Sequence, residues 1–186
     1  MPGPQPGRPD RWGWHPLSDA AARRLVADAP VGSGDLVLDP GAGRGAITRP
    51  LLATGARGLA VELHAGRLRT LHDLAVDEPR LTVIRADVRD LRLPRRPFRA
   101  VGSPPYDGTS ALLARLLTPG SRLVSADLVV QRGLARRWAE GRAPGAGRWS
   151  RRWSVEVGRA VPRRAFARPP RVDSVVLRAR LSTGGR

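Results

Sequence analysis

Asp39, Glu62 and Asp87 each follow a short run of apolar residues in the sequence. If those runs are neighbouring parallel strands, their carboxyl ends share one edge of a sheet, and open α/β sheets bind their ligands at that edge. A carboxylate there can accept hydrogen bonds from ribose hydroxyls or from the amino group of an adenine. We therefore expect a nucleoside site in which Glu62 holds the ribose and Asp87 the adenine, although Asp87 taken alone could equally cap a turn.

A glycine-rich segment, Asp-Pro-Gly-Ala-Gly-Arg-Gly, begins with the first of these carboxylates. Gly41, Gly43 and Gly45 let the backbone turn sharply and approach a nucleoside closely, because no Cβ intervenes. The spacing from Gly43 to Glu62 also occurs in NAD enzymes, so it does not name the cofactor. The segment lacks the later glycine of the dinucleotide fingerprint, and Asp87 adds a further carboxylate. These two features favour S-adenosylmethionine as the cofactor.

The segment Ser103-Pro104-Pro105-Tyr106 ends the next apolar run and has the residue types needed for methyl transfer to an amino group. An exocyclic amino nitrogen is a poor nucleophile, so its hydrogens must be held and its lone pair aimed at the methyl group. The Ser103 hydroxyl and the Pro104 carbonyl are suitable acceptors, and the prolines fix the backbone in advance. Tyr106 would stack on a base that has left its helix or loop. A plain Pro-Pro turn is the alternative.

Short apolar runs alternate with helical patterns from residue 35 onward, which predicts βαβ units and a parallel sheet. The expected strands are Leu36–Leu38, Gly58–Val61, Leu81–Ile84, Ala100–Gly102, Leu128–Val130, Trp153–Val161 and Ser174–Leu181. The expected helices lie near residues 45–53, 64–76, 109–117 and 132–140, and a Gly/Pro/Ala loop is expected over 141–147. The fold class that follows is α/β and Rossmann-like, with a seven-stranded, mostly parallel sheet and an antiparallel last strand.

The domain organisation follows from composition and length. Residues 1–10 are rich in Pro and Gly and predict a disordered leader. Residues 11–30 predict a helical segment, in which Ser18 is the N-cap and Leu25 and Val26 belong to the apolar stripe. Residues 31–182 are expected to form a single methyltransferase domain, because a chain of 186 residues has little room for a second one.

The charge balance points to a nucleic-acid partner. Lys and Arg together number 33 against 16 acidic residues, the net charge is +17, and every cation is an arginine. Guanidinium groups bind phosphates through paired hydrogen bonds and also stack on bases. Codon bias in a GC-rich genome would explain arginine in place of lysine, but not the excess.

Other functional classes are disfavoured by what the sequence lacks. There is no cysteine, so disulfides and thiolate metal sites are excluded, and we expect no metal. No apolar run approaches the ~20 residues that span a membrane, and the N-terminus does not resemble a signal peptide. A cytoplasmic protein without membrane contact is therefore expected.

Taken together, these motifs resemble those of the Erm-type 23S rRNA adenine N6-methyltransferases, relatives of the KsgA rRNA adenine dimethylases. The resemblance runs from about Trp12 to Leu181. It is carried by these segments: Asp39-Pro-Gly-Ala-Gly-Arg-Gly45, Ala60-Val-Glu-Leu63, Arg85-Ala-Asp87, Ser103-Pro-Pro-Tyr106, Val161-Pro-Arg-Arg-Ala-Phe166 and Pro170-Arg-Val-Asp-Ser174. The last two form the most family-specific block, since the glycine loop and Pro-Pro-Tyr occur in many amino-methyltransferases.

The resemblance implies a reaction and a set of site residues. It implies methylation of an adenine in 23S rRNA, which confers resistance to macrolide-type antibiotics, by a monomer that lacks the family's C-terminal helical domain. Tyr106 and Phe166 would hold the flipped adenine between them, next to Ser103 and Pro104. The implied cofactor-binding residues are His15, Leu17, Gly41, Gly43, Glu62, Leu63, Asp87, Val88 and Ser103.

Three departures from the family pattern leave alternatives open, and the expected lack of the C-terminal helical domain is one of them. Ser103 stands where the family usually has Asn, and Ser-Pro-Pro-Tyr is also familiar from cytosine-N4 methyltransferases. The segment Gly13-Trp-His-Pro-Leu17 replaces the family's usual Gly-Gln-Asn-Phe-Leu. The alternatives are an enzyme acting on cytosine N4 or on a protein glutamine, and a weakly active rRNA-binding or assembly protein.

Two arginine-rich regions interleave cations with tryptophans and predict contacts to RNA phosphates and unpaired bases. The predicted RNA-binding residues are Arg136, Arg137, Arg148, Trp149, Arg151, Arg152, Arg163 and Arg164. Trp138 and Trp153 are more readily explained as core residues, because most tryptophans are largely buried. His64 and His72 are expected at solvent-facing helix positions rather than as catalytic bases or metal ligands.

Overall fold

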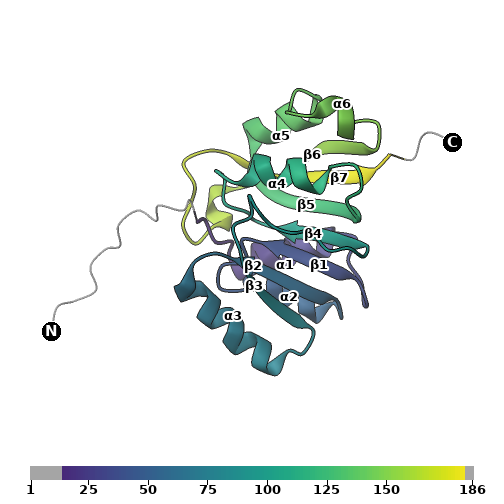
Figure 1. Ribbon diagram of the computed structural model, residues 1–186. Coiled ribbons are helices and arrows are strands. Elements are labelled where there is room, and N and C mark those ends of the chain that lie inside the picture. Colours follow the sequence, from purple (N-terminus) through teal and green to yellow (C-terminus); the bar gives the residue numbers. More distant parts are fainter. Residues whose placement is uncertain (1–13, 183–186) are drawn as a thin grey trace.

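A computed structural model describes residues 14–182 as a single α/β unit built on one seven-stranded sheet (Figure 1). The strand order is β3-β2-β1-β4-β5-β7-β6. The strands are β1 (Leu36–Pro40), β2 (Arg57–Glu62), β3 (Leu81–Arg85), β4 (Phe98–Gly102), β5 (Leu123–Gln131), β6 (Trp153–Val161) and β7 (Ser174–Leu181). All seven strands predicted from the apolar runs are present.

The direction of the strands confirms the predicted fold class. β1 to β5 pair in parallel, whereas β7 runs antiparallel to both β5 and β6, between which it lies. The chain moves outward from β1 through β2 to β3 and then returns to place β4 on the other side of β1. This reversal is a topological switch point, the place where sheets of this kind form a crevice for ligands.

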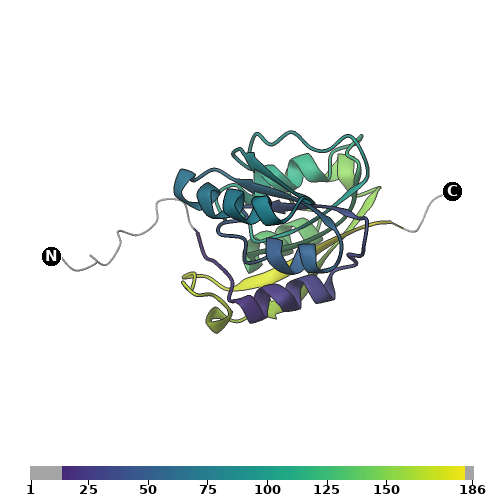
Figure 2. The same cartoon turned by 90° about the horizontal axis from the view of Figure 1, so that it is seen from below.

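Helices cover both faces of the sheet (Figure 2). They are α1 (Asp19–Asp28), α2 (Thr48–Ala53), α3 (Ala65–Asp77), α4 (Thr109–Leu116), α5 (Arg132–Ala139), α6 (Ala146–Trp149) and the 3₁₀ turn η1 (Arg163–Ala165). Figure 1 shows α3 at the β3 end of the sheet and α5 and α6 at the β6 end. Within residues 14–182, no helix is long and apolar enough to cross a membrane.

Strand alternation divides the core between the two faces. Leu36 and Leu38 of β1 belong to the large cluster packed with α4 and α5, whereas Val37 between them packs with α1 and α2. Successive side chains of a strand point to opposite faces, so a strand buried on both sides is apolar throughout. Asp39 breaks that rule, since it is 1% exposed on the central strand.

The helix α1 begins as its sequence predicts. Ser18 is the N-cap, and its hydroxyl accepts a hydrogen bond from the amide of Ala21 at 3.3 Å. Leu25 and Val26 are buried. The residues just before α1 lie beside the loop that contains η1, because Leu17 forms an antiparallel bridge with Phe166. The predicted leader, residues 1–10, and the start of the 11–30 segment lie outside the described residues.

Several predicted boundaries differ from the structure. The helix expected from residue 45 begins at Thr48, because Gly45 has a φ of 89° and belongs to the preceding turn. The strand expected at Leu128–Val130 is longer, since β5 starts at Leu123. The predicted 141–147 loop was too long, because α6 begins at Ala146 after Gly145 adopts a φ of 77°. Glycine provides these left-handed conformations without steric cost.

Three tryptophans form part of the core at the β6 end of the sheet. Trp138 and Trp153 are buried, as expected for core residues. Trp149 is also buried, at 5% exposure, and its ring stacks on Trp138 with 5.2 Å between ring centroids. The prediction that Trp149 stacks on RNA bases was therefore wrong for this structure. A helical turn that places an indole between arginines buries the ring and leaves the cations in solvent.

Trp138→Ala tests how much this cluster stabilises the fold. The side chain is 1% exposed, so its loss leaves a cavity, and we expect the free energy of unfolding to fall by about 3–5 kcal/mol in urea titrations. Val76→Ala, at a position that is 83% exposed, is the control and should change it by less than about 0.5 kcal/mol. Similar values for the two variants would show that the cluster does not stabilise the fold.

Candidate active site

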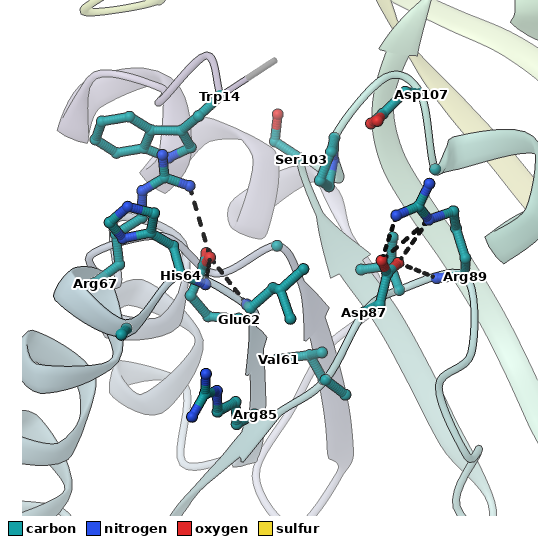
Figure 3. A pocket seen from close by; sticks show the side chains of 17 residues that line it. Trp14, Val61, Glu62, His64, Arg67, Arg85, Asp87, Arg89, Ser103 and Asp107 are labelled. Atoms are coloured by element: carbon teal, nitrogen blue, oxygen red, sulfur yellow. Dashed lines mark hydrogen bonds and ion pairs between the residues drawn. The ribbon is translucent and has the colours of Figure 1, made fainter. Parts of the chain in front are cut away.

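A cavity of about 530 Å³ opens at the carboxyl ends of β1 to β4 (Figure 3). Its volume falls within the range of about 300–1,000 Å³ that is usual for small-molecule and cofactor sites. Seventeen residues line it: Trp14, Gly41, Val61, Glu62, Leu63, His64, Ala65, Arg67, Arg85, Ala86, Asp87, Val88, Arg89, Ser103, Pro105, Asp107 and Gly108. The cavity thus lies across the switch point of the sheet.

The glycine loop packs directly against the Ser-Pro-Pro segment. Gly41 has a φ of 76°, and a Cβ added to it would lie 2.9 Å from Cδ of Pro105 and 3.2 Å from Cα of Pro104. Any larger residue at this position would therefore push the two segments apart. The contact sets the first segment, which is suited to hold a nucleoside, beside the second, which is suited to hold an amino group.

The carboxylate of Glu62 is held mainly by backbone amides. Its Oε2 accepts from the amide of Gly43 at 2.9 Å, and its Oε1 accepts from the amides of Leu63 at 3.0 Å and His64 at 2.8 Å. The spacing between glycine loop and acid, visible in the sequence, is thus a direct hydrogen bond in the structure. Glu62 is 5% exposed and faces the cavity from the end of β2 (Figure 3).

Two residues that were not predicted as site residues, Arg67 and Trp14, complete this side of the cavity. Arg67 lies 3.6 Å from Oε1 of Glu62, measured from its Nη1. The ring of Trp14 covers the guanidinium, with 4.1 Å between Cζ of Arg67 and the ring centroid. Figure 3 shows Trp14, Arg67 and Glu62 arranged one above the other along one wall. His64, expected at a helix surface, is exposed but caps α3, since its Nδ1 accepts from the amide of Gly66.

Asp87 occupies the opposite wall and is paired with Arg89 (Figure 3). The guanidinium donates to both carboxylate oxygens, at 2.6 to 3.0 Å, and the Arg89 amide donates to Oδ1 at 2.9 Å. These hydrogen bonds, opposed by partial burial, lower the pKa of Asp87. Asp87 therefore caps a turn and also lines the cavity, so the structure is compatible with both roles considered from the sequence, the turn cap and the adenine acceptor.

Asp39 lies behind the glycine loop rather than in the cavity. Its Oδ2 accepts from the hydroxyl of Thr48 at 2.7 Å, and its Oδ1 has no hydrogen-bond partner in the described part of the chain. Burial raises its pKa to about 7; the Thr48 hydroxyl opposes this rise, and the negative charge of Glu62 adds to it. Asp39 is thus part of the support of the loop.

Tyr106 lies beyond the cavity wall formed by Ser103 and Pro105. Its hydroxyl is 2.6 Å from Oγ of Ser174, at the start of β7. Burial raises the pKa of Tyr106, and the hydrogen bond to Ser174 opposes that rise. The imidazole of His15 lies against the phenol ring, with 5.4 Å between ring centroids and 36° between ring planes. Tyr106 is therefore held at its hydroxyl and along its ring.

The segment before α1 joins both sides of the site. Trp14 lines the cavity and His15 contacts Tyr106, while Nδ1 of His15 lies 3.1 Å from the carbonyl oxygen of Arg168. Leu17 bridges to Phe166. The side chains of Leu17 and Phe166 are buried, at 5% and 4% exposure, and neither lines the cavity. In this structure Phe166 thus supports the site and has no ring face available to a base.

The structure brings most of the predicted site residues together. Six predicted cofactor-binding residues line the cavity: Gly41, Glu62, Leu63, Asp87, Val88 and Ser103. Gly43 does not line the cavity, but its amide donates a hydrogen bond to Glu62, which does. His15 and Leu17 lie outside the cavity. Pro104 and Tyr106 adjoin it behind Ser103. Arg89 lies two residues after Asp87, and Trp14 belongs to the segment Gly13–Leu17 that the sequence singles out, but neither was predicted as a site residue, and Arg67 had no sequence signal.

The predicted RNA-binding arginines lie at two ends of the molecule. Arg163 and Arg164 are exposed on η1, beside the site. Arg151 and Arg152 are exposed at the opposite end of the β6–β7 pair, since Trp153 pairs with Leu181. A strand rises about 3.3 Å per residue, so the eight residues of β7 separate the two ends by roughly 23 Å. Also exposed are Arg136 and Arg137 on α5 and Arg148 on α6.

The cavity suits S-adenosylmethionine chemically. Glu62 offers an acceptor for ribose hydroxyls, Asp87 one for an adenine amino group, and Leu63 and Val88 offer apolar surface for the base. Gly41 packs tightly on Pro105 and has no side chain, so the backbone of the glycine loop can approach the cofactor closely. An electrophilic methyl group at the Ser103 wall would face the segment suited to hold an amino group.

Asp39→Asn tests the buried carboxyl behind the loop. A folded-state pKa of about 7, above the ordinary value of 3.8, means that the folded protein binds more protons between these values than the unfolded chain does. The stability of the wild type should therefore fall as the pH rises across this window, relative to Asp39→Asn. Urea titrations of both proteins at several pH values measure this difference. A constant difference across the window would contradict the raised pKa.

Comparisons with known proteins agree with this geometry. A model of the ribosomal RNA adenine dimethylase family matches residues 18–183. An rRNA methyltransferase of Streptomyces thermotolerans is 36% identical over 84% of this chain and 53% of its own length. Ribosomal RNA small subunit methyltransferase A of Thermosynechococcus vestitus is 38% identical over 90% and 67%. The crystal structure of the 23S rRNA methyltransferase ErmE matches with a TM-score of 0.76 at 29% identity, covering 90% of this chain and 70% of that one.

The chain spans 53% to 67% of the length of these two relatives. A dimethyladenosine transferase of Plasmodium falciparum has the same fold, with a TM-score of 0.75 at 20% identity over 90% of this chain and 64% of that one. These comparisons confirm the resemblance, the fold class and the cofactor expected from the sequence. The chain belongs to the ribosomal RNA adenine dimethylase family, whose methyl donor is S-adenosylmethionine.

Proposed function

We propose that this protein transfers a methyl group from S-adenosylmethionine to N6 of an adenine in 23S rRNA, in the cytoplasm and as a monomer. The observation that carries the proposal is the packing of the glycine loop, at Gly41, against Pro104 and Pro105. This contact places a cavity suited to the donor beside a segment suited to the acceptor. Residues 31–182 would form the catalytic unit, preceded by the helical segment 11–30.

The mechanism assigns a task to each group at the Ser103 wall. When bound, S-adenosylmethionine supplies an electrophilic methyl group. The Ser103 hydroxyl and the Pro104 carbonyl accept the two amino hydrogens of the base, which aims the nitrogen lone pair at the methyl carbon. Tyr106 stacks on the base, and its own orientation is fixed by Ser174 and His15. The proton released after attack leaves through these acceptors to water.

A base sandwich with Phe166 requires a rearrangement of the segment before α1. Phe166 is 4% exposed, so its ring becomes available to a base only if the residues that cover it move, and its backbone bridge to Leu17 places the segment before α1 beside it. Tyr106 is only half-buried, and the segment before α1 contacts its ring through His15. We therefore assign the main stacking role to Tyr106 and infer that Phe166 contributes after RNA binding.

The assignment of 23S rather than 16S rRNA rests on two supports. The late block Val161–Phe166 resembles the Erm type, and the ErmE structure overlays most of this chain. Small-subunit enzymes are also among the relatives, at similar identity, so identity to relatives does not distinguish 23S from 16S rRNA as the target. Methylation of 23S rRNA by this protein would confer resistance to macrolide-type antibiotics, and the arginines at both ends of the molecule would bind the phosphates.

The target is tested by incubating the protein with labelled S-adenosylmethionine and naked 23S or 16S rRNA, followed by mass spectrometry of the nucleosides. We expect N6-methylated adenosine in 23S rRNA. The variant Tyr106→Ala tests the stacking role and should lower the rate roughly 10- to 100-fold, because base stacking on an aromatic ring is lost. Label confined to 16S rRNA would move the target to the small subunit. Label on cytosine or a protein, or no transfer at all, would overturn the proposed reaction.

The RNA surface is tested by the salt dependence of binding. Each phosphate contact contributes about 0.7–0.9 to the slope of log affinity against log salt concentration. The double substitution Arg163→Ala/Arg164→Ala should therefore reduce the slope by roughly 1.4–1.8. Arg23→Ala/Arg69→Ala, which removes exposed arginines from α1 and α3, is the charge-matched control and should leave it unchanged. Equal slopes in both doubles would exclude a specific role for the η1 arginines.

A further inference from the structure

Arg67 is an unusual residue for its place in the fold. It lies in the first turn of α3 and is 7% exposed. Helix N-termini carry partial positive charge, so a cation there is unfavourable for the helix. Burying a guanidinium also costs free energy unless it is paired. Neither helix stability nor burial explains an arginine here, so its contacts must.

The two contacts of Arg67 described above are with Glu62 and Trp14, which both line the donor cavity. Nη1 of Arg67 lies 3.6 Å from Oε1 of Glu62, and the ring of Trp14 covers the guanidinium at 4.1 Å (Figure 3). A cation over an indole face is attracted by the ring quadrupole, most strongly where water is excluded. The guanidinium is thus placed between the aromatic ring and the carboxylate.

Trp14 is itself seated on the glycine loop. A Cβ added to Gly43 would lie 2.8 Å from Nε1 of Trp14, so only glycine leaves room for the indole at this place. The amide of the same glycine donates to Oε2 of Glu62. Trp14, Arg67 and Gly43 therefore meet around one carboxylate.

We propose that Arg67, clamped under Trp14, is a positioning residue that orients Glu62 toward the ribose hydroxyls of the methyl donor. A carboxylate has about four acceptor positions. The amides of Leu63 and His64, together with Arg67, approach Oε1, whereas Oε2 accepts only from Gly43 among the contacts described above. Oε2 is left as the acceptor for the ribose, and the ion pair of Arg67 with Oε1 adds to the backbone amides in keeping the carboxylate in that orientation.

The proposal concerns donor binding alone, so it can be tested without RNA and whatever the base methylated. Calorimetry would compare S-adenosylhomocysteine with its 2′-deoxyribose analogue in the wild type and in Arg67→Met. In the wild type we expect the ribose form to bind about tenfold more tightly or better, since a hydrogen bond to a charged group is lost in the analogue. In Arg67→Met this preference should fall toward one, chiefly through weaker binding of the ribose form.

Three further variants make the result specific. Arg69→Met, at an exposed position of the same helix, should keep the full ribose preference. Trp14→Ala should reduce the preference, and Trp14→Phe, which keeps an aromatic face, should retain most of it. If thermal melting shows that Arg67→Met does not fold, the Trp14 pair carries the test.

Two results would overturn the proposal. An unchanged ribose preference in Arg67→Met, or in Trp14→Ala where that variant carries the test, would mean that the pair does not orient Glu62. Tighter binding of S-adenosylhomocysteine by Arg67→Met would mean that the arginine obstructs the carboxylate.

Discussion

The carboxylate of Glu62 is the point at which three separate parts of the chain meet. The glycine loop reaches it through the amide of Gly43, and the start of α3 reaches it through the amide of His64 and through Arg67. The segment before α1 contacts Arg67 through the ring of Trp14. A buried carboxylate must be satisfied by donors, so these parts cannot move apart without leaving it uncompensated. The shape of the donor cavity depends on this requirement.

The acceptor side depends on the same edge of the sheet but on different contacts. β4 lies beside β1, which sets Ser103 next to the glycine loop. Antiparallel β7 brings Ser174 back to the same edge, where it meets the hydroxyl of Tyr106. Because β7 runs antiparallel to β5, its first residue, Ser174, pairs with the last residue of β5, Gln131, at the edge of the sheet where the site lies.

The segment before α1 connects the two sides. It contacts the donor cavity through Trp14 and the acceptor tyrosine through His15, and it is fixed to the loop before β7 by the Leu17–Phe166 bridge. Movement of this segment would therefore alter both sides together. This arrangement explains why Phe166 is buried here.

The sequence predicted the sheet, its class and most of the cavity, because strand periodicity and the glycine–acid spacing are local signals. Glu62, Asp87 and Ser103 could be placed in this way. The contact between Trp14 and Arg67 could not, because it depends on how segments distant in the sequence pack, even though Trp14 lies in the recognised segment Gly13–Leu17. Trp149 was misjudged for a related reason, since an indole between arginines looks the same in a buried helical turn as on an RNA-binding surface.

The most direct test of this account is a crystal structure of the protein with S-adenosylhomocysteine bound. We expect the ribose hydroxyls to lie within hydrogen-bond distance of the Glu62 carboxylate, the adenine amino group to face Asp87, and the sulfur to point toward Ser103. A ligand whose ribose lies away from Glu62, or whose sulfur faces away from the Ser103-Pro104-Pro105 segment, would contradict it.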